Sequence, residues 1–206
     1  GLLCEERAKN IDVAEKCYQR ALAIDGKSKL ALDGLKRVYQ HRADPARVVQ
    51  VIERQEMLVA GEERAALAAE RGVILRDQVQ DAPAAVAAFE AALAASPSHA
   101  DSAVALVELA DKGTGKENVL ANLSTLVDVF AKTRRIRDRH LLLHKLGVLA
   151  EASSQPAAAI AAFEAAYQAA STHLPTLLSL ARLYYDAGHW EKALKMLQIL
   201  LLNEGS

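Results

Sequence analysis

A period of 34 residues runs through the sequence and constrains the fold more than any other feature. Within two blocks near the C-terminus, apolar residues fall three or four positions apart, which places them on one face of a helix. One helix pair cannot bury its apolar face alone, so the period predicts helix-turn-helix units that stack on their neighbours. The residues Leu143, Leu146, Gly147 and Ala150 recur as Leu177, Leu180, Ala181 and Tyr184, and Ala159, Phe163 and Ala166 recur as Ala193, Leu197 and Leu200.

The second helix of each unit can be followed upstream by its large central residue. Successive central residues are 34, 37, 34, 40 and 34 positions apart. We expect the surplus residues near Gln55 to Ala65 and near Ala131 to Arg139, because turns between repeats tolerate insertions. The central residues are Tyr18, Ile52, Phe89, Leu123, Phe163 and Leu197.

Composition supports a helical reading. The 206 residues include 41 Ala and 30 Leu, both strong helix formers, whereas aromatic residues make up only 4%. A fold rich in β-strands needs more aromatic and β-branched residues than this. The chain is therefore predicted to be all-α, with about eleven helices.

Two segments resemble the tetratricopeptide repeat (TPR). Leu177 to Leu201 reads LLSLARLYYDAGHWEKALKMLQILL, and the block from Lys145 reads KLGVLAEASSQPAAAIAAFEAAYQAA with the Leu-Gly pair of this family. The resemblance implies one right-handed α-solenoid of about five and a half repeats covering residues 1–206. Its repeats would be 1–28 (partial), 29–62, 63–99, 100–138, 139–172 and 173–206.

Both ends of the chain lack features of a terminal repeat. Ile11 to Asp25 is predicted to be the second helix of the first repeat, yet only about ten residues precede it. The last helix is apolar on nearly every side from Met196 to Leu202. A terminal repeat normally presents a polar outer face. We therefore expect the chain to be a segment of a longer bacterial array, or to self-associate by burying its C-terminal helix in another subunit.

Charge and hydropathy exclude several classes of partner. The 25 basic and 26 acidic residues nearly cancel, which argues against a nucleic-acid binder. No apolar run reaches the 18 residues that a membrane span requires. Cys4 and Cys17 are too few for a disulfide framework, so we expect a cytoplasmic location. A targeting sequence upstream of this segment is the alternative.

The TPR resemblance implies where a ligand would bind. In this family the first helix of each pair lines a concave groove that holds peptides or partner helices. A chaperone-tail clamp is absent, because Asp33, Arg37, Ala69 and Val73 stand at the clamp positions. By alignment the groove residues are Asp33, Arg37, Gln40, Ala69, Val73, Arg76, Asp101, Val104, Glu108, His144, Val148, Glu151, Leu178, Arg182 and Tyr185.

One basic cluster stands out from the balanced charge. It comprises Lys132, Arg134, Arg135, Arg137 and Arg139. Such a cluster is typical of a solvated turn that leads into a helix. Contact with an acidic partner surface and contact with nucleic acid remain alternatives.

No residue pattern predicts catalysis or a metal site. Asp111 to Glu117 contains two glycines and a lysine but lacks the spacing of a phosphate loop. His140 and His144 share a helix face, yet no third ligand has suitable spacing. We therefore expect no enzyme activity, metal, cofactor or small-molecule substrate.

The sequence thus predicts a non-catalytic scaffold or adaptor that holds a peptide or a protein surface in its groove. The alternative is a regulatory or substrate-recruiting arm of a larger enzyme or signalling protein.

Overall fold

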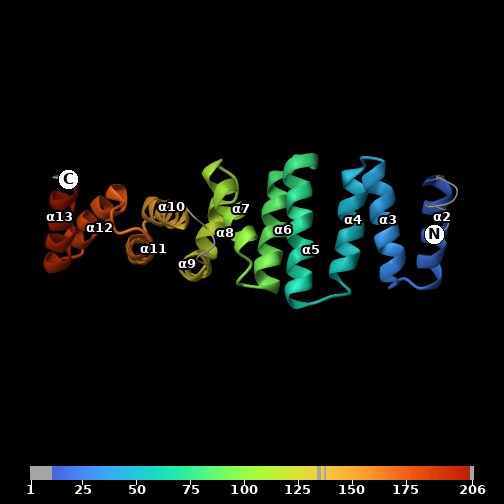
Figure 1. Cartoon of the computed structure of the whole chain (residues 1–206), viewed down its shortest axis with the longest axis horizontal. Coiled ribbons are helices and arrows are strands. Elements are labelled where there is room, and N and C mark those ends of the chain that lie inside the picture. Colours follow the sequence, from blue (N-terminus) through green and yellow to red (C-terminus); the bar gives the residue numbers. More distant parts are fainter. Residues whose placement is uncertain (1–10, 134–135, 137, 205–206) are drawn as a thin grey trace. The chain divides into compact units, whose positions relative to one another are not determined.

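A computed structural model of the chain describes residues 11–133, 136 and 138–204. Within these residues it contains twelve α-helices, one π-helical segment and no strand (Figure 1). The predicted all-α helical-repeat fold is confirmed.

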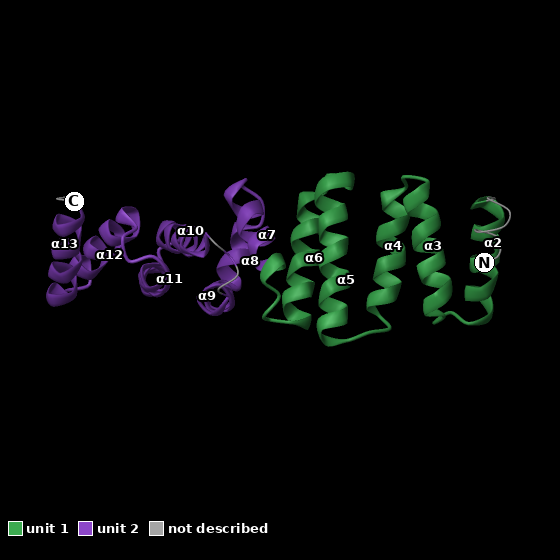
Figure 2. Cartoon of the chain, in the orientation of Figure 1, with its two compact units in different colours: residues 1–102 green, residues 103–206 purple. Residues whose placement is uncertain are grey.

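The contacts divide the chain into two compact units, residues 1–102 and 103–206, with the boundary inside one helix (Figure 2). In the first unit lie α2 (Ile11–Ile24), α3 (Lys29–His41), α4 (Pro45–Glu56), α5 (Gly61–Ile74), the π-helical segment η1 (Leu75–Val79) and α6 (Ala82–Ala95). Helix α7 (Ala100–Asp111) contains the boundary, and the second unit continues with α8 (Lys116–Ala121), α9 (Leu123–Lys132), α10 (Arg139–Ala152), α11 (Pro156–Ala169), α12 (Leu174–Asp186) and α13 (Trp190–Glu204).

Local signals in the turns set where several helices begin and end. Asp44 caps α4 by accepting a hydrogen bond of 3.1 Å from the backbone N–H of Arg47, and Pro45 occupies the first helical position. Asp81 caps α6 in the same way through the backbone N–H of Ala84, at 3.0 Å. Gly188 follows α12 with φ of 75°, a left-handed conformation that suits glycine at the end of a helix.

Helix pairs in both units cross at a glycine packed against a phenylalanine. A Cβ built on Gly72 would lie 2.7 Å from Cε1 of Phe89, and one built on Gly147 would lie 2.5 Å from Cε1 of Phe163. Both rings are almost completely buried. The close approach of α5 to α6 and of α10 to α11 therefore requires a residue without a side chain at each crossing.

Leu197 differs from the phenylalanines at the equivalent position. It is the large central residue of its helix in the repeat pattern, but it is 47% exposed, whereas Phe163 is fully buried. The outer side of a second helix becomes buried when the next repeat packs on it. Among the described residues, α13 makes extensive contact with α12 only, so its outer side stays exposed.

The first predicted insertion lies elsewhere than expected. The connection 57–60 between α4 and α5 is as short as 25–28 and 96–99, so no surplus falls near Gln55 to Ala65. The surplus instead lengthens the first helix of that repeat, where α5 continues into η1 and ends at Gln80 in a left-handed conformation. A π turn accommodates extra residues inside a helix.

The second helix of the following repeat is interrupted. Asn122 separates α8 from α9, and its side-chain amide donates a 2.9 Å hydrogen bond to the backbone carbonyl of Asn118. This hydrogen bond satisfies a carbonyl near the end of α8. The break explains why the described residues hold twelve α-helices where the sequence predicted about eleven.

Candidate functional site

Successive first helices lie side by side within each unit, and residues 34 apart meet across them. Lys29 Nζ lies 3.4 Å from Glu63 Oε1, and Lys36 Nζ lies 2.5 Å from Glu70 Oε2, joining α3 to α5. In the second unit, Lys145 Nζ lies 2.6 Å from Asp111 Oδ2 and joins α10 to α7. These ion pairs show that the first helices of adjacent repeats are in contact.

All fifteen residues of the predicted groove lie on first helices, and none is buried. Four of the exposed ones are large and apolar: Val73, Val148, Leu178 and Tyr185. Exposed apolar groups among polar ones are typical of surfaces that bind another protein.

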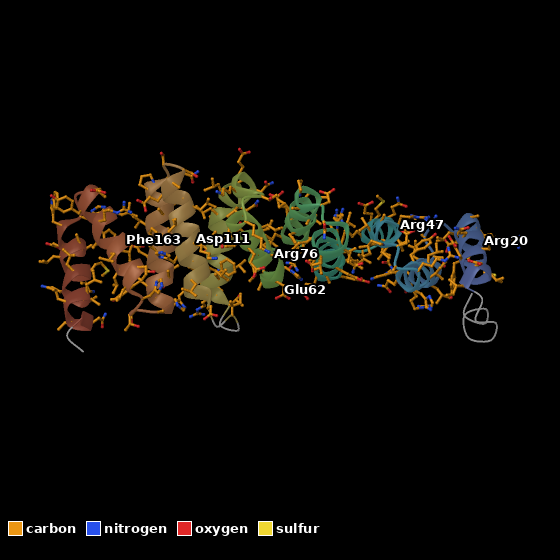
Figure 3. All side chains as sticks on the ribbon, turned by 90° about the horizontal axis from the view of Figure 1, so that it is seen from above. Arg20, Arg47, Glu62, Arg76, Asp111 and Phe163 are labelled. Carbon is orange, nitrogen blue, oxygen red and sulfur yellow. The ribbon has the colours of Figure 1, made fainter. Side chains whose placement is uncertain are left out.

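In the first unit, polar contacts hold the groove residues of α3. Asp33 Oδ1 accepts a 2.6 Å hydrogen bond from Nε2 of the buried Gln55 on α4. Arg37 donates to the phenolic oxygen of Tyr18 at 3.5 Å. Arg76, labelled in Figure 3, lies on η1. It forms two hydrogen bonds with the carboxylate of Asp77, at 2.7 and 2.9 Å.

Each unit has a hollow at the same place in the repeat, between the end of one first helix, the start of its second helix and the next first helix. The unit 1 notch has a volume of about 270 Å³ and is lined by Gln40, Ala43, Asp44, Pro45, Val48, Glu70, Val73, Ile74 and Gln78. The unit 2 notch, also about 270 Å³, is lined by Val107, Ala110, Asp111, Lys116, Val119, Lys145, Leu146, Val148, Leu149 and Ala152. Gln40, Val73 and Val148 of the predicted groove set line these notches.

The last repeats carry further groove residues in specific contacts. Glu151 on α10 forms an ion pair with Arg182 on α12. The ring of Tyr185 meets that of Trp190 edge to face, with centroids 4.9 Å apart. Both rings are about 60% exposed and add an aromatic surface beside Leu178.

Three histidines come together where α10 meets α12, which the sequence did not predict. The ring centroid of His173 lies 5.2 Å from those of His140 and His144. Nδ1 of His144 and Nδ1 of His173 lie 3.1 and 2.7 Å from the hydroxyl oxygen of the buried Thr176. The sequence offered no third ligand near His140 and His144 because His173 is 29 residues away from the nearer of them, at the start of another helix.

Burial lowers the pKa values of two of these histidines. Desolvation lowers the pKa of His144 most, and the charge of His173 lowers it further. The pKa of His173 is lowered by desolvation and then by the charge of His140. Within the part of the chain that the structure describes, no three His, Cys, Asp or Glu side chains are arranged to hold a metal ion.

The predicted basic cluster is only partly described. Lys132 is exposed and pairs with Asp128 on its own helix at 3.1 Å. Arg139 is half-buried at the start of α10. Arg134, Arg135 and Arg137 lie outside the described residues.

The glycine-containing segment Asp111 to Glu117 connects α7 to α8. Gly113 and Gly115 have φ values of 100° and 81°, as expected for a tight turn between helices. None of the helices formed by the described residues is both long and apolar enough to cross a membrane.

The helices and their crossings define a helical-repeat protein. A family model described as tetratricopeptide repeat matches residues 150–205, which contain the end of α10 and the whole of α11, α12 and α13. Residues 150–205 therefore carry the tetratricopeptide repeat that the sequence predicted for this part of the chain. No curated protein sequence matches the chain.

Several solved structures resemble the chain. YrrB, described as a TPR protein with an unusual peptide-binding site, is 16% identical with a TM-score of 0.49, over 94% of this chain and 95% of that one. MamA from Desulfovibrio magneticus RS-1 is 16% identical with a TM-score of 0.45, over 87% of this chain and 97% of that one. PilF from Pseudomonas aeruginosa is 15% identical with a TM-score of 0.43, over 94% and 78%. The family match, rather than these structures, identifies the type of repeat in residues 150–205.

Proposed function

We propose that the chain is a non-catalytic, cytoplasmic scaffold that binds a peptide or a protein surface along its first helices. The observation that carries this proposal is the set of exposed side chains on α3, α5, α10 and α12, which mixes charges with the apolar Val73, Val148, Leu178 and Tyr185. Surfaces of this composition bury apolar area at their centre and keep charges at the rim. The tetratricopeptide repeat is a class of protein-interaction module, which agrees with this role.

A further observation supports a scaffold rather than an enzyme. Among the residues that the structure describes, the titratable groups with shifted pKa values do not converge in an enclosed pocket with a nucleophile and a base.

Charge reversal along the first helices tests the proposal. We expect the triple variant Arg37→Glu, Arg76→Glu and Arg182→Glu to lose most of the partner that the parent chain captures from a lysate of the source cells. The control reverses three exposed charges on second helices, with Arg20→Glu, Arg54→Glu and Lys195→Glu. Circular dichroism establishes that both variants are folded. Equal capture by the two variants would show that the partner does not bind along the first helices.

We also infer that a further repeat or another subunit covers α13. Leu194, Leu197, Leu201 and Leu202 are exposed on this helix. If the covering subunit is a second copy of this chain, sedimentation velocity should show self-association that increases with protein concentration. Association should be lost in the variant Leu197→Lys, Leu201→Lys and retained in Leu30→Lys, which changes an exposed leucine of α3. A chain that stays monomeric at all concentrations rules out the second copy.

A further inference from the structure

The unit 2 notch is an apolar hollow with charges only at its rim. Its wall consists of Val107, Ala110, Val119, Leu146, Val148 and Leu149. The small Ala110 and the exposed Ala152 stand where larger side chains would fill the space. The hollow therefore follows from the sequence at these two positions.

The size of the notch suits one large apolar side chain. Its volume is about 270 Å³. An apolar cavity of roughly 150 Å³ is large enough to hold benzene. A leucine, phenylalanine or tryptophan side chain therefore fits, while an alanine would leave most of the wall uncovered.

The rim of the notch carries a net positive charge. Lys145 pairs with Asp111, whereas Lys116 is exposed and forms no ion pair with any residue that the structure describes. Asp111 therefore neutralises one of the two lysines at the rim. A carboxylate beside the inserted side chain would pair with Lys116 and gain from the remaining charge.

We propose that the unit 2 notch binds one large apolar side chain of an extended acidic peptide segment, with a neighbouring carboxylate on Lys116. This inference rests on the proposed function and specifies the chemistry of one subsite within it. The apolar wall selects side-chain size, and the rim selects the sign of the adjacent charge.

Binding of defined peptide mixtures tests this inference. The probe is a mixture of acetylated, amidated nonapeptides with Leu, Ile, Phe or Trp at the centre and Asp or Glu on both sides. Binding to the full 206-residue chain is measured by fluorescence polarisation. Control mixtures carry Ala at the centre or Lys on both sides, and we expect each control to bind at least about fivefold more weakly.

Two variants of the chain probe the wall and the rim separately. Ala152→Leu fills the notch from an exposed position and should weaken binding about tenfold. Lys116→Glu should weaken it about fivefold, and its effect should shrink at high salt. The matched controls are Ala157→Leu on α11 and Lys112→Glu in the same turn, which are both exposed and do not line the notch.

Methyl NMR locates the bound peptide. Shifts of the Val107, Val119, Val148 and Leu149 methyl groups on titration, absent in Ala152→Leu, would support the inference. Failure of every acidic mixture to bind overturns it, as does binding that Ala152→Leu and Lys116→Glu leave unchanged. If binding survives these two variants but is lost on reversing Arg37, Arg76 and Arg182, the notch is wrong and the scaffold proposal stands.

Discussion

The two notches occupy the same place in the repeat but differ in chemistry. Val73 and Val148 correspond in the alignment of the groove residues, and so do Ile74 and Leu149. The neighbouring position is Glu70 in unit 1 and Lys145 in unit 2, and the unit 1 notch also contains Asp44. A shared backbone arrangement therefore presents an acidic, polar hollow in one unit and a basic-rimmed, apolar one in the other.

The π-helical segment adds to this difference. It contributes Gln78 to the unit 1 notch, whereas α10 in unit 2 ends at Ala152 without such an extension. Lengthening one first helix thus changes the lining of the hollow beside it. A few residues of the wall and the rim therefore give the notch of each unit its own chemistry.

The largest expected effect tests whether the two units share one packing scheme. Phe89→Ala and Phe163→Ala each remove a buried ring beside a glycine, and each should lower the free energy of unfolding by about 3–5 kcal/mol. Leu197→Ala should cost about 1 kcal/mol or less, because that side chain is half exposed. Urea denaturation measures all three. A small loss for only one phenylalanine would show that the units are packed differently.

Exchanging the charges of the notches tests whether these charges set ligand preference. Lys145→Glu should weaken binding of the acidic peptide mixture about tenfold, because it removes one rim cation and adds a carboxylate beside Asp111. Glu70→Lys should leave that binding within about twofold, since Glu70 lies in the other unit. Fluorescence polarisation provides both values, and equal losses would contradict separate preferences.

Acid should destabilise the second unit through its partly buried histidines. The folded-state pKa values of His144 and His173 are lowered, while an unfolded histidine titrates near 6.5. As the pH falls below about 6.5, the unfolded chain binds protons that the folded chain does not, so the free energy of unfolding decreases until the folded-state pKa values are passed. His140 adds a like charge when protonated, and Phe163 offers no counter-charge.

Urea denaturation between about pH 7.5 and about pH 5.5 measures this loss. The variant His144→Gln, His173→Asn should lose less stability over this range than the parent, with Asn retaining a residue suited to the start of α12. His41→Asn, which changes an exposed histidine of α3, is the matched control. A parent and double variant with the same pH dependence would exclude the histidine cluster as its source.

The smallest effect concerns the ion pairs between first helices. Lys29→Ala should change the free energy of unfolding by no more than about 0.5 kcal/mol, because both partners are more than half exposed. Lys36→Ala should lower the free energy of unfolding more than Lys29→Ala does, since the Lys36 side chain is only 18% exposed. Thermal unfolding at low and high salt ranks the two. A larger effect of Lys29 would show that exposure does not govern these pairs.

Repeat identity and core positions could be predicted from the sequence because both follow from periodic apolar spacing. Phe89 and Phe163 are examples, because they occupy the central position of their second helices in the sequence pattern and are buried in the structure. The π segment at Leu75–Val79 was missed, because a local change of helical winding leaves the apolar residues nearly periodic. The ion pairs could have been found by searching for opposite charges 34 positions apart.

The notches and the histidine cluster could not be predicted in this way. They depend on how side chains from three different helices meet, as Val107, Val119 and Leu149 do in unit 2. Spacing along one helix says which face a residue occupies, but not how much space its neighbours leave. His173 likewise joins His140 only because α12 begins beside α10.

The pairing of residues 34 apart has a consequence for how such a chain can change its length. Adding or removing one whole repeat by recombination preserves the spacing between neighbouring repeats, so contacts like that of Lys36 with Glu70 can form again at the new junction. Losing a single residue from the middle of a helix instead moves the following residues of that helix to another face. Gene duplication can therefore extend the array and then diversify each copy at its rim residues, without rebuilding the packing that holds the copies together.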